Sequence, residues 1–153
     1  MKKKIFVCLA AFALALSLCA CGVGGSQNAG FSESRWGDDM ETVIASLEGE
    51  RFLPIEDVIV VMGTEVEGMT ASAIYTVDSA NGLTSIGYMF EELQDPAADY
   101  NALKDAITQT NGKPDTDGDL TEWNTKAETV QMSMGKDDDG EVVIVCNFAA
   151  AQD

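Results

Sequence analysis

The chain contains no histidine among its 153 residues. This absence excludes Ser-His and Cys-His nucleophile systems and zinc sites that depend on imidazole. Basic residues are also few, because nine lysines and arginines face 26 aspartates and glutamates. Such negative charge repels nucleic acid and anionic lipid headgroups, and it favours cations or a basic partner. High net charge also keeps a protein soluble, which is a sufficient explanation by itself. We expect no nucleic-acid partner.

A long apolar run lies at the N-terminus. Three lysines at positions 2–4 precede residues 5–18, which are almost entirely apolar. A charged segment followed by an apolar one is typical of a secretory signal. The run is shorter than the roughly twenty apolar residues that a membrane helix needs. We therefore expect residues 1–20 to be a signal peptide.

The signal ends with Leu18-Cys19-Ala20-Cys21-Gly22. These residues resemble the lipobox of bacterial lipoproteins, with Leu at the third position before the cut, a small residue before it and Cys after it. The resemblance implies a diacylglycerol thioether on Cys21, usually with a further acyl chain such as palmitate on its amine. Cys19 is the weaker alternative, because Leu18 precedes it and the processing site favours a small residue. A plain secretory signal cut after Ala20 would instead leave Cys21 as a free thiol.

Lipidation at Cys21 implies a protein anchored to the cell membrane on its extracytoplasmic side, since more than one acyl chain gives a stable anchor. Residues 22–30, which follow the lipidated Cys21, are mostly small or polar. We therefore expect residues 21–30 to form a flexible tether. Residues 31–153 are enough for a single domain. Removal of residues 1–20 takes three lysines and no acid, so six basic residues would face 26 acidic ones, a formal charge of −20.

Cysteine is scarce beyond the signal. Cys146 stands alone once Cys21 carries lipid, so no internal disulfide can form. Cys146 lies in the apolar run 142–148 and is predicted to be a small buried side chain rather than a nucleophile. The sequence also lacks a Gly-x-Ser-x-Gly elbow and a phosphate-binding glycine loop. We therefore predict that the protein is not an enzyme and needs no cofactor.

Hydrophobic periodicity predicts two helices and six strands. The first helix, of about three turns, begins after Asp38 and Asp39 and ends near Gly49, and the second runs from Pro96 to about residue 110. The strands are expected at 57–66, 71–77, 83–90, 120–126, 129–134 and 141–148. The predicted fold class is α+β, an antiparallel sheet covered by two helices in the order α-β-β-β-α-β-β-β. This order suggests an internal duplication.

Acidic loops and tryptophans are the remaining binding candidates. Asp115, Asp117 and Asp119 alternate as in calcium loops, but Leu120 replaces the needed glycine and Lys126 stands where the closing glutamate belongs. Weak calcium binding shared with the acidic run 137–139 is the alternative to solvated turns, and we assign no metal site. The tryptophans at 36 and 123 are predicted to pack in the core, the first of them as a staple across the first helical turn.

A wider resemblance involves the segment 31–43, with Arg35-Trp36-Gly37 before an acidic turn. It resembles the opening of small lipoproteins of Gram-positive bacteria, and the segment from Tyr100 through Gly112-Lys113-Pro114 to Trp123 looks like their second unit. The arrangement is also similar to outer-membrane assembly lipoproteins and β-lactamase inhibitory proteins. That resemblance implies helix-on-sheet units that bind other proteins without catalysis.

Together these features predict a membrane-anchored, extracytoplasmic lipoprotein that acts as a non-catalytic protein-interaction module. Its expected partners are the membrane, through Cys21, and an envelope protein. The alternative is a lipoprotein that binds a small ligand or a cation such as calcium. A deep apolar pocket would favour the alternative, and a flat or concave sheet without such a pocket would favour the interaction module, which would dock through its exposed sheet edges or acidic face.

Overall fold

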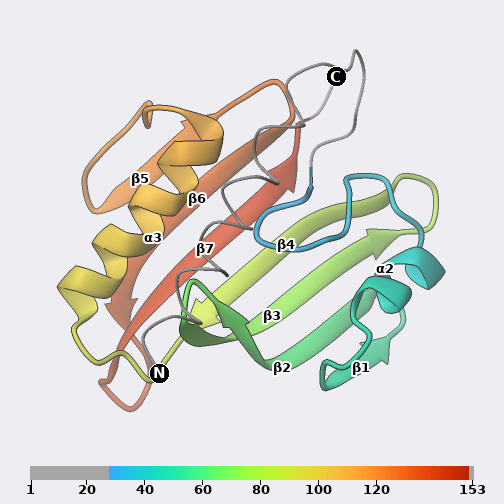
Figure 1. Cartoon of the computed structure of the whole chain (residues 1–153), viewed down its shortest axis with the longest axis horizontal. Helices are drawn as coiled ribbons and strands as arrows, with labels where there is room; N and C mark the ends of the chain where they lie inside the picture. The colour runs from blue at the N-terminus through green and yellow to red at the C-terminus, as the bar shows by residue number, and fades with distance from the viewer. Residues whose placement is uncertain (1–27, 152–153) are drawn as a thin grey trace, which may run out of the picture.

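The computed structural model describes residues 28–151, and Figure 1 shows them as an antiparallel sheet with helices on one side. The sheet has seven strands in the order β1-β2-β3-β4-β7-β6-β5. The elements are α2 (Met40–Ser46), β1 (Phe52–Ile55), β2 (Val58–Val66), β3 (Met69–Asp78), β4 (Gly82–Phe90), α3 (Pro96–Asn111), β5 (Leu120–Asn124), β6 (Glu128–Lys136) and β7 (Val142–Ala150). Within this part of the chain the α+β class, with an antiparallel sheet and two helices, is confirmed.

The predicted element order is wrong, because four strands rather than three follow the first helix. The additional strand is β1, which has four residues and includes Pro54. Proline donates no backbone hydrogen bond and is tolerated at a sheet edge, which is where β1 lies. The two halves join into one sheet because β4 pairs with β7, for example Tyr88 with Cys146. An internal duplication stays a prediction.

The first helix is also shorter than predicted, at seven residues instead of about three turns. Asp39 caps it by accepting a hydrogen bond from the Thr42 backbone N–H at 2.8 Å. Hydrogen bonding from the Thr42 side chain, and next from its backbone N–H, lowers the pKa of the Asp39 carboxyl. The helix ends at Leu47, whose N–H bonds to the carbonyl of Ile44 in a tightened last turn. Leu47 still packs in the core although it lies outside the helix.

The second helix, α3, has the predicted ends. Asp95 accepts a hydrogen bond from the Ala98 N–H, and Pro96 occupies the first turn, where no intrahelical donor is needed. Gly112, with φ of 82°, ends the helix. Leu103 and Ile107 bury the face that rests on the sheet. The sequence signals for this helix are therefore sufficient to place it.

The folded domain begins before the residue predicted for the end of the tether. Ala29 is fully buried, and its N–H donates to the Ser34 carbonyl at 2.7 Å. A few residues later the segment pairs with β4, since the Gly37 N–H bonds to the Leu83 carbonyl and the Leu83 N–H to the Asp38 carbonyl. Residues 28–30 thus belong to the domain. The rest of the predicted tether, the signal peptide and Cys21 lie outside the described residues.

The hydrophobic core lies between the sheet and the layer formed by the helices and the segment 28–38. An aromatic cluster stands at its centre, where Tyr88 and Phe148 meet edge to face with ring centroids 5.9 Å apart and Phe31 covers both. The core also holds Trp123, Phe90, Ile59, Leu83, Ile86, Leu103, Met132 and Ile144. Of residues 28–151, no helix is long and apolar enough to cross a bilayer.

Candidate functional site

The sheet face opposite the helices is the first candidate surface, and we call it the open face (Figure 1). The strand register places Leu53, Val60 and Ile74 in one cross-strand row on this face. The next cross-strand row contains Met62, Ser72, Met89 and Val145, from β2, β3, β4 and β7 in turn. The six apolar side chains define the apolar patch, in which Leu53 and Ile74 are 53% and 50% exposed. None of the described elements covers it.

The rest of the open face, on β5, β6 and β7, is mostly polar and internally paired, apart from Leu120 at the start of β5, which is 44% exposed. Glu122 accepts hydrogen bonds from the side chains of Gln131 at 2.8 Å and Asn124 at 2.9 Å. These bonds lower the pKa of the Glu122 carboxyl. Thr129 in turn donates to the Asn124 side chain at 3.0 Å. Because these groups satisfy one another, the polar part contributes to sheet stability and offers little free bonding capacity to a ligand.

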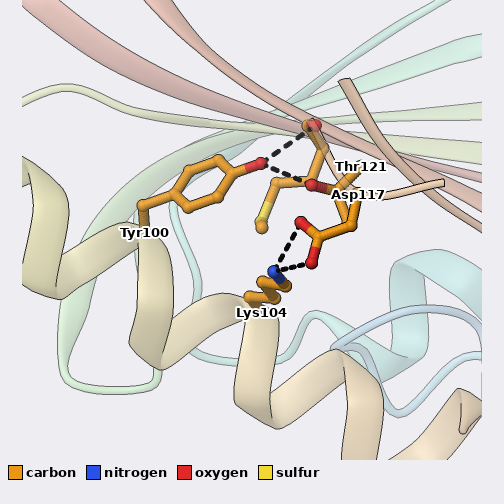
Figure 2. A network of polar contacts seen from close by, with 5 residues as sticks. Tyr100, Lys104, Asp117 and Thr121 are labelled. Carbon is orange, nitrogen blue, oxygen red and sulfur yellow. Dashed lines mark hydrogen bonds and ion pairs between the residues drawn. The ribbon is translucent and has the colours of Figure 1, made fainter. Parts of the chain in front are cut away.

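The acidic loop before β5 does not gather its carboxylates at one point. Asp115 accepts the Asn124 backbone N–H at 2.8 Å, whereas Asp117 forms an ion pair with Lys104 of α3 at 2.6 Å. Figure 2 shows this pair beside the hydrogen bond between Tyr100 of α3 and Thr121 of β5, which is 2.8 Å long. The loop thus helps to hold α3 against the sheet, as solvated structural turns do.

The second acidic run has a comparable local role. Asp137 accepts hydrogen bonds from the backbone N–H groups of Asp139 and Glu141, which closes the turn between β6 and β7. Over residues 28–151, no three His, Cys, Asp or Glu side chains come together closely enough to hold a metal ion. The geometry therefore offers no support for calcium shared between the two acidic segments.

The remaining predicted residues lie in the core or against it. Cys146 is fully buried, and burial raises the pKa of its thiol to about 12, so the reactive thiolate is suppressed at neutral pH. Trp123 is also fully buried. Trp36 packs against the core as predicted, but its indole N–H also donates to Glu128 at 3.1 Å. Sequence reasoning missed Glu128, because an acid at a strand start gives no signal of burial.

Several hollows lie on the surface of the described residues, with volumes of about 320 to 650 Å³. They are open to solvent and lined by polar as well as apolar groups, unlike the deep apolar pocket that would have favoured a lipophilic ligand. One of them, beside Tyr75 and Tyr88, is strongly acidic and borders a buried hydroxyl. No sequence pattern indicates this hollow, since its residues come from α2, β2, β3, β4 and two loops.

Comparisons of the chain with protein-family models, with curated proteins and with solved structures find no match.

Proposed function

We propose that this chain is a membrane-anchored, extracytoplasmic lipoprotein whose domain docks a basic partner protein through the apolar patch, without catalysis. The anchoring part rests on the lipobox resemblance around Cys21. The docking part rests on one observation above all, which is the exposed row Leu53, Val60 and Ile74 with Met89 beside it on a sheet face without a described cover.

The apolar patch is unusual for the outer face of an antiparallel sheet. Strands with one face in water normally alternate apolar inward and polar outward residues. In β2 and β3 the outward positions instead hold Val60, Met62 and Ile74, next to inward Val61 and Tyr75. Contiguous exposed apolar side chains of this kind mark interaction surfaces in soluble domains. A flat strand surface fits a protein better than a small molecule, which needs a concave site.

The charge of the domain selects the chemistry of the partner. Acidic residues adjoin the patch at the strand ends, where Glu56 and Asp57 follow β1 and Glu91 follows β4. With a formal charge of −20 after removal of the signal, two copies of the chain would repel one another. The same negative charge would attract a basic protein. The partner that fits is therefore a basic envelope protein with an apolar strip among its cations.

The absence of catalysis is supported by the chemistry of the side chains. Histidine is missing from the sequence, and the Cys146 thiol is buried with a pKa of about 12. Small-ligand binding is the second candidate function, and the acidic hollow beside Tyr88 favours it for a separate site on the helix-covered side of the sheet.

The docking proposal is tested by in-cell crosslinking and affinity capture of the tagged full-length protein. The variant combines Ile74→Thr with Met89→Thr, because threonine preserves strand propensity while removing exposed apolar area. We expect the parent protein to capture a basic protein and the double variant to capture at least about tenfold less of it, since each buried side chain contributes about 1.5–3 kcal/mol. Raising the salt concentration should weaken capture by the parent.

The matched control is Met134→Thr, because Met134 is 46% exposed but lies on the helix-covered side, paired with Ile144. Its capture should equal that of the parent. A Cys21→Ala version tests the anchor separately, and it should lose membrane association and crosslinking in the cell. Equal capture by the parent and the patch variant, or a captured partner that is acidic, would contradict docking at this face.

A further inference from the structure

The first cross-strand row of the apolar patch continues from β3 into β4 with a glycine. Gly87 pairs with Ile74 of β3 and with Asn147 of β7. The residues on either side of it in the chain, Ile86 and Tyr88, are buried in the core, so Gly87 belongs to the open face. A position without a side chain therefore lies between two exposed side chains, those of Ile74 and Asn147. We call this position the Gly87 gap.

The fold itself does not require a glycine at this position. The φ of Gly87 lies outside the left-handed region that favours glycine. Apart from its neighbours in the chain, a Cβ added there would meet one atom within 4 Å, the Asn147 Oδ1 at 3.0 Å, and an exposed side chain can turn away from such a contact. Glycine also weakens a strand, because it loses the most conformational freedom on folding. A glycine inside a strand is typical of a place where a ligand or another chain approaches the backbone closely.

The groups around the Gly87 gap specify what fits there. Ile74 is apolar, and Met89, two residues along β4, adds a thioether, which makes favourable contacts with aromatic rings. On the side of β7, Asn147 brings an oxygen that can accept a hydrogen bond. An aromatic side chain that covers a strand glycine is a recurrent stabilising device in sheets. Tryptophan and tyrosine suit all these groups, because each combines a flat apolar ring with one N–H or O–H donor.

We propose that the Gly87 gap is the anchor site for one tryptophan or tyrosine side chain of the basic partner. This inference rests on the proposed docking at the open face and specifies the partner further. The ring lies on the Gly87 backbone between Ile74 and Asn147, and its N–H or O–H donates to the Asn147 Oδ1. Cations beside this aromatic residue point toward the acidic strand ends. Aromatic anchors in the centre of an interface contribute most of the binding energy in many complexes.

The test is an NMR titration of the isotope-labelled full-length chain in a nonionic detergent. The probe is the peptide acetyl-Lys-Trp-Lys-amide, and acetyl-Lys-Ala-Lys-amide is a control of the same charge. We expect the tryptophan peptide to bind at millimolar concentration and to shift the amide signals of Gly87, Ile74 and Asn147 most. The alanine peptide should bind about tenfold more weakly, because it lacks the ring whose burial drives binding.

Two glycine variants separate the Gly87 gap from general effects on the sheet. Gly87→Thr fills the gap and should weaken the tryptophan peptide about tenfold or more, as the loss of an anchor site does. Gly135→Thr is the matched control, because Gly135 lies on the open face of β6, paired with Val143, and a Cβ added there meets no atom within 4 Å. It should change the affinity less than about twofold, because the two positions are far apart on the sheet. Both variants should keep or raise the urea midpoint, since threonine favours strands, and lost binding at an unchanged midpoint is not a folding effect.

The hydrogen bond to the partner is tested separately with Asn147→Ala. This variant should weaken the tryptophan peptide about threefold, which is the size expected for one hydrogen bond at a surface. It should leave the binding of acetyl-Lys-Phe-Lys-amide unchanged, because a phenylalanine ring has no N–H or O–H to donate.

Three results would overturn the proposal: amide shifts centred away from Gly87, equal binding of the tryptophan and alanine peptides, or equal affinities of the parent and Gly87→Thr for the tryptophan peptide. The capture experiment distinguishes this failure from a failure of docking. If Gly87→Thr captures the partner as the parent does while Ile74→Thr with Met89→Thr loses it, docking stands and the anchor role is wrong. If the peptide binds at Gly87 but the parent captures no basic protein, docking is wrong and the aromatic site stands.

Discussion

At the scale of single residues, Gly82 shows why one position in a turn accepts no side chain. Its φ is 71°, and a Cβ added there would lie 2.2 Å from the carbonyl oxygen of Gly37. Both the backbone conformation and the contact with the N-terminal segment therefore require glycine. Asp78 organises the same turn by accepting the N–H groups of Ala80 and Asn81, which lowers the pKa of its carboxyl.

We predict that Gly82→Ala lowers the free energy of unfolding by about 3 kcal/mol or more, because the methyl group meets rigid backbone and the φ is unfavourable. Gly140→Ala is the matched control, since Gly140 has a φ of 86° with no atom within 4 Å of the added Cβ. It should cost only about 1 kcal/mol, which is the conformational part alone. Urea unfolding of both variants measures the difference, and equal losses would show that the close approach of Gly37 is not maintained in solution.

The Asn81-Gly82 pair predicts the turn from the sequence, but no local pattern predicts the contact of Gly82 with Gly37. The same limit applies to the hollow, whose tyrosines at 75 and 88 read only as inward positions of two strands. The burial of the Tyr88 ring depends on how the segment 28–38 folds over it, because Phe31 packs against that ring at 5.6 Å. No local pattern encodes such a relation between distant segments.

At the scale of elements, Glu128 links three parts of the fold at the start of β6. It is 5% exposed, and it accepts hydrogen bonds from the Trp36 indole at 3.1 Å and the Asn111 side chain at 2.8 Å. The Gly30 N–H approaches it at 3.5 Å. The segment 28–38 and the end of α3 are thereby tied to the sheet through one carboxylate.

We predict that Glu128→Ala lowers the free energy of unfolding by about 2–4 kcal/mol, because two buried or half-buried donors lose their acceptor. Hydrogen exchange should accelerate first in residues 28–38, since that segment is short and depends on this contact. Trp36→Phe should lower the free energy of unfolding by a smaller amount. The double variant Trp36→Phe with Glu128→Ala should be little less stable than Glu128→Ala alone, because both changes remove the same hydrogen bond. Fully additive losses, or unchanged exchange in residues 28–38, would disprove the linking role.

Most elements could be predicted because their signals are local. Asp95-Pro96 and Gly112 define α3, and the alternation in β3 and β4 defines those strands. Strand β1 was missed because four residues containing Pro54 carry no usable period, and it gains its stability from pairing with β2. The first helix was predicted too long for a similar reason. The spacing of Leu47 from Val43 and Ile44 fits a helix, but Leu47 is already the residue that ends α2.

At the scale of the whole molecule, the joining of β4 to β7 unites strands that are more than fifty residues apart in the chain. Periodicity identifies strands but not their partners, so the single seven-stranded sheet could not be read from the sequence. The consequence matters for function, because only a continuous sheet places Met89 of β4 beside Val145 of β7 in the apolar patch.

The excess of acidic over basic side chains should make the stability of the fold depend on salt concentration. One ion pair, between Lys104 and Asp117, occurs in residues 28–151, so most carboxylates repel one another without compensation. We expect the urea midpoint to rise as NaCl is increased from about 20 mM to about 300 mM, because screening relieves repulsion in the compact state. Most of the rise should occur below about 150 mM, where the Debye length changes most.

Calcium and magnesium distinguish screening from a specific site. Because Asp115 and Asp117 are held by Asn124 and Lys104, CaCl2 and MgCl2 at the same concentration should raise the midpoint equally. A larger rise with calcium would reveal an oxygen-ligand site that prefers the larger ion, and Asp117→Asn would then be expected to abolish the excess. A midpoint that does not respond to salt would mean that the acidic side chains are too far apart to destabilise the fold, and their number would then bear on solubility and partner choice alone.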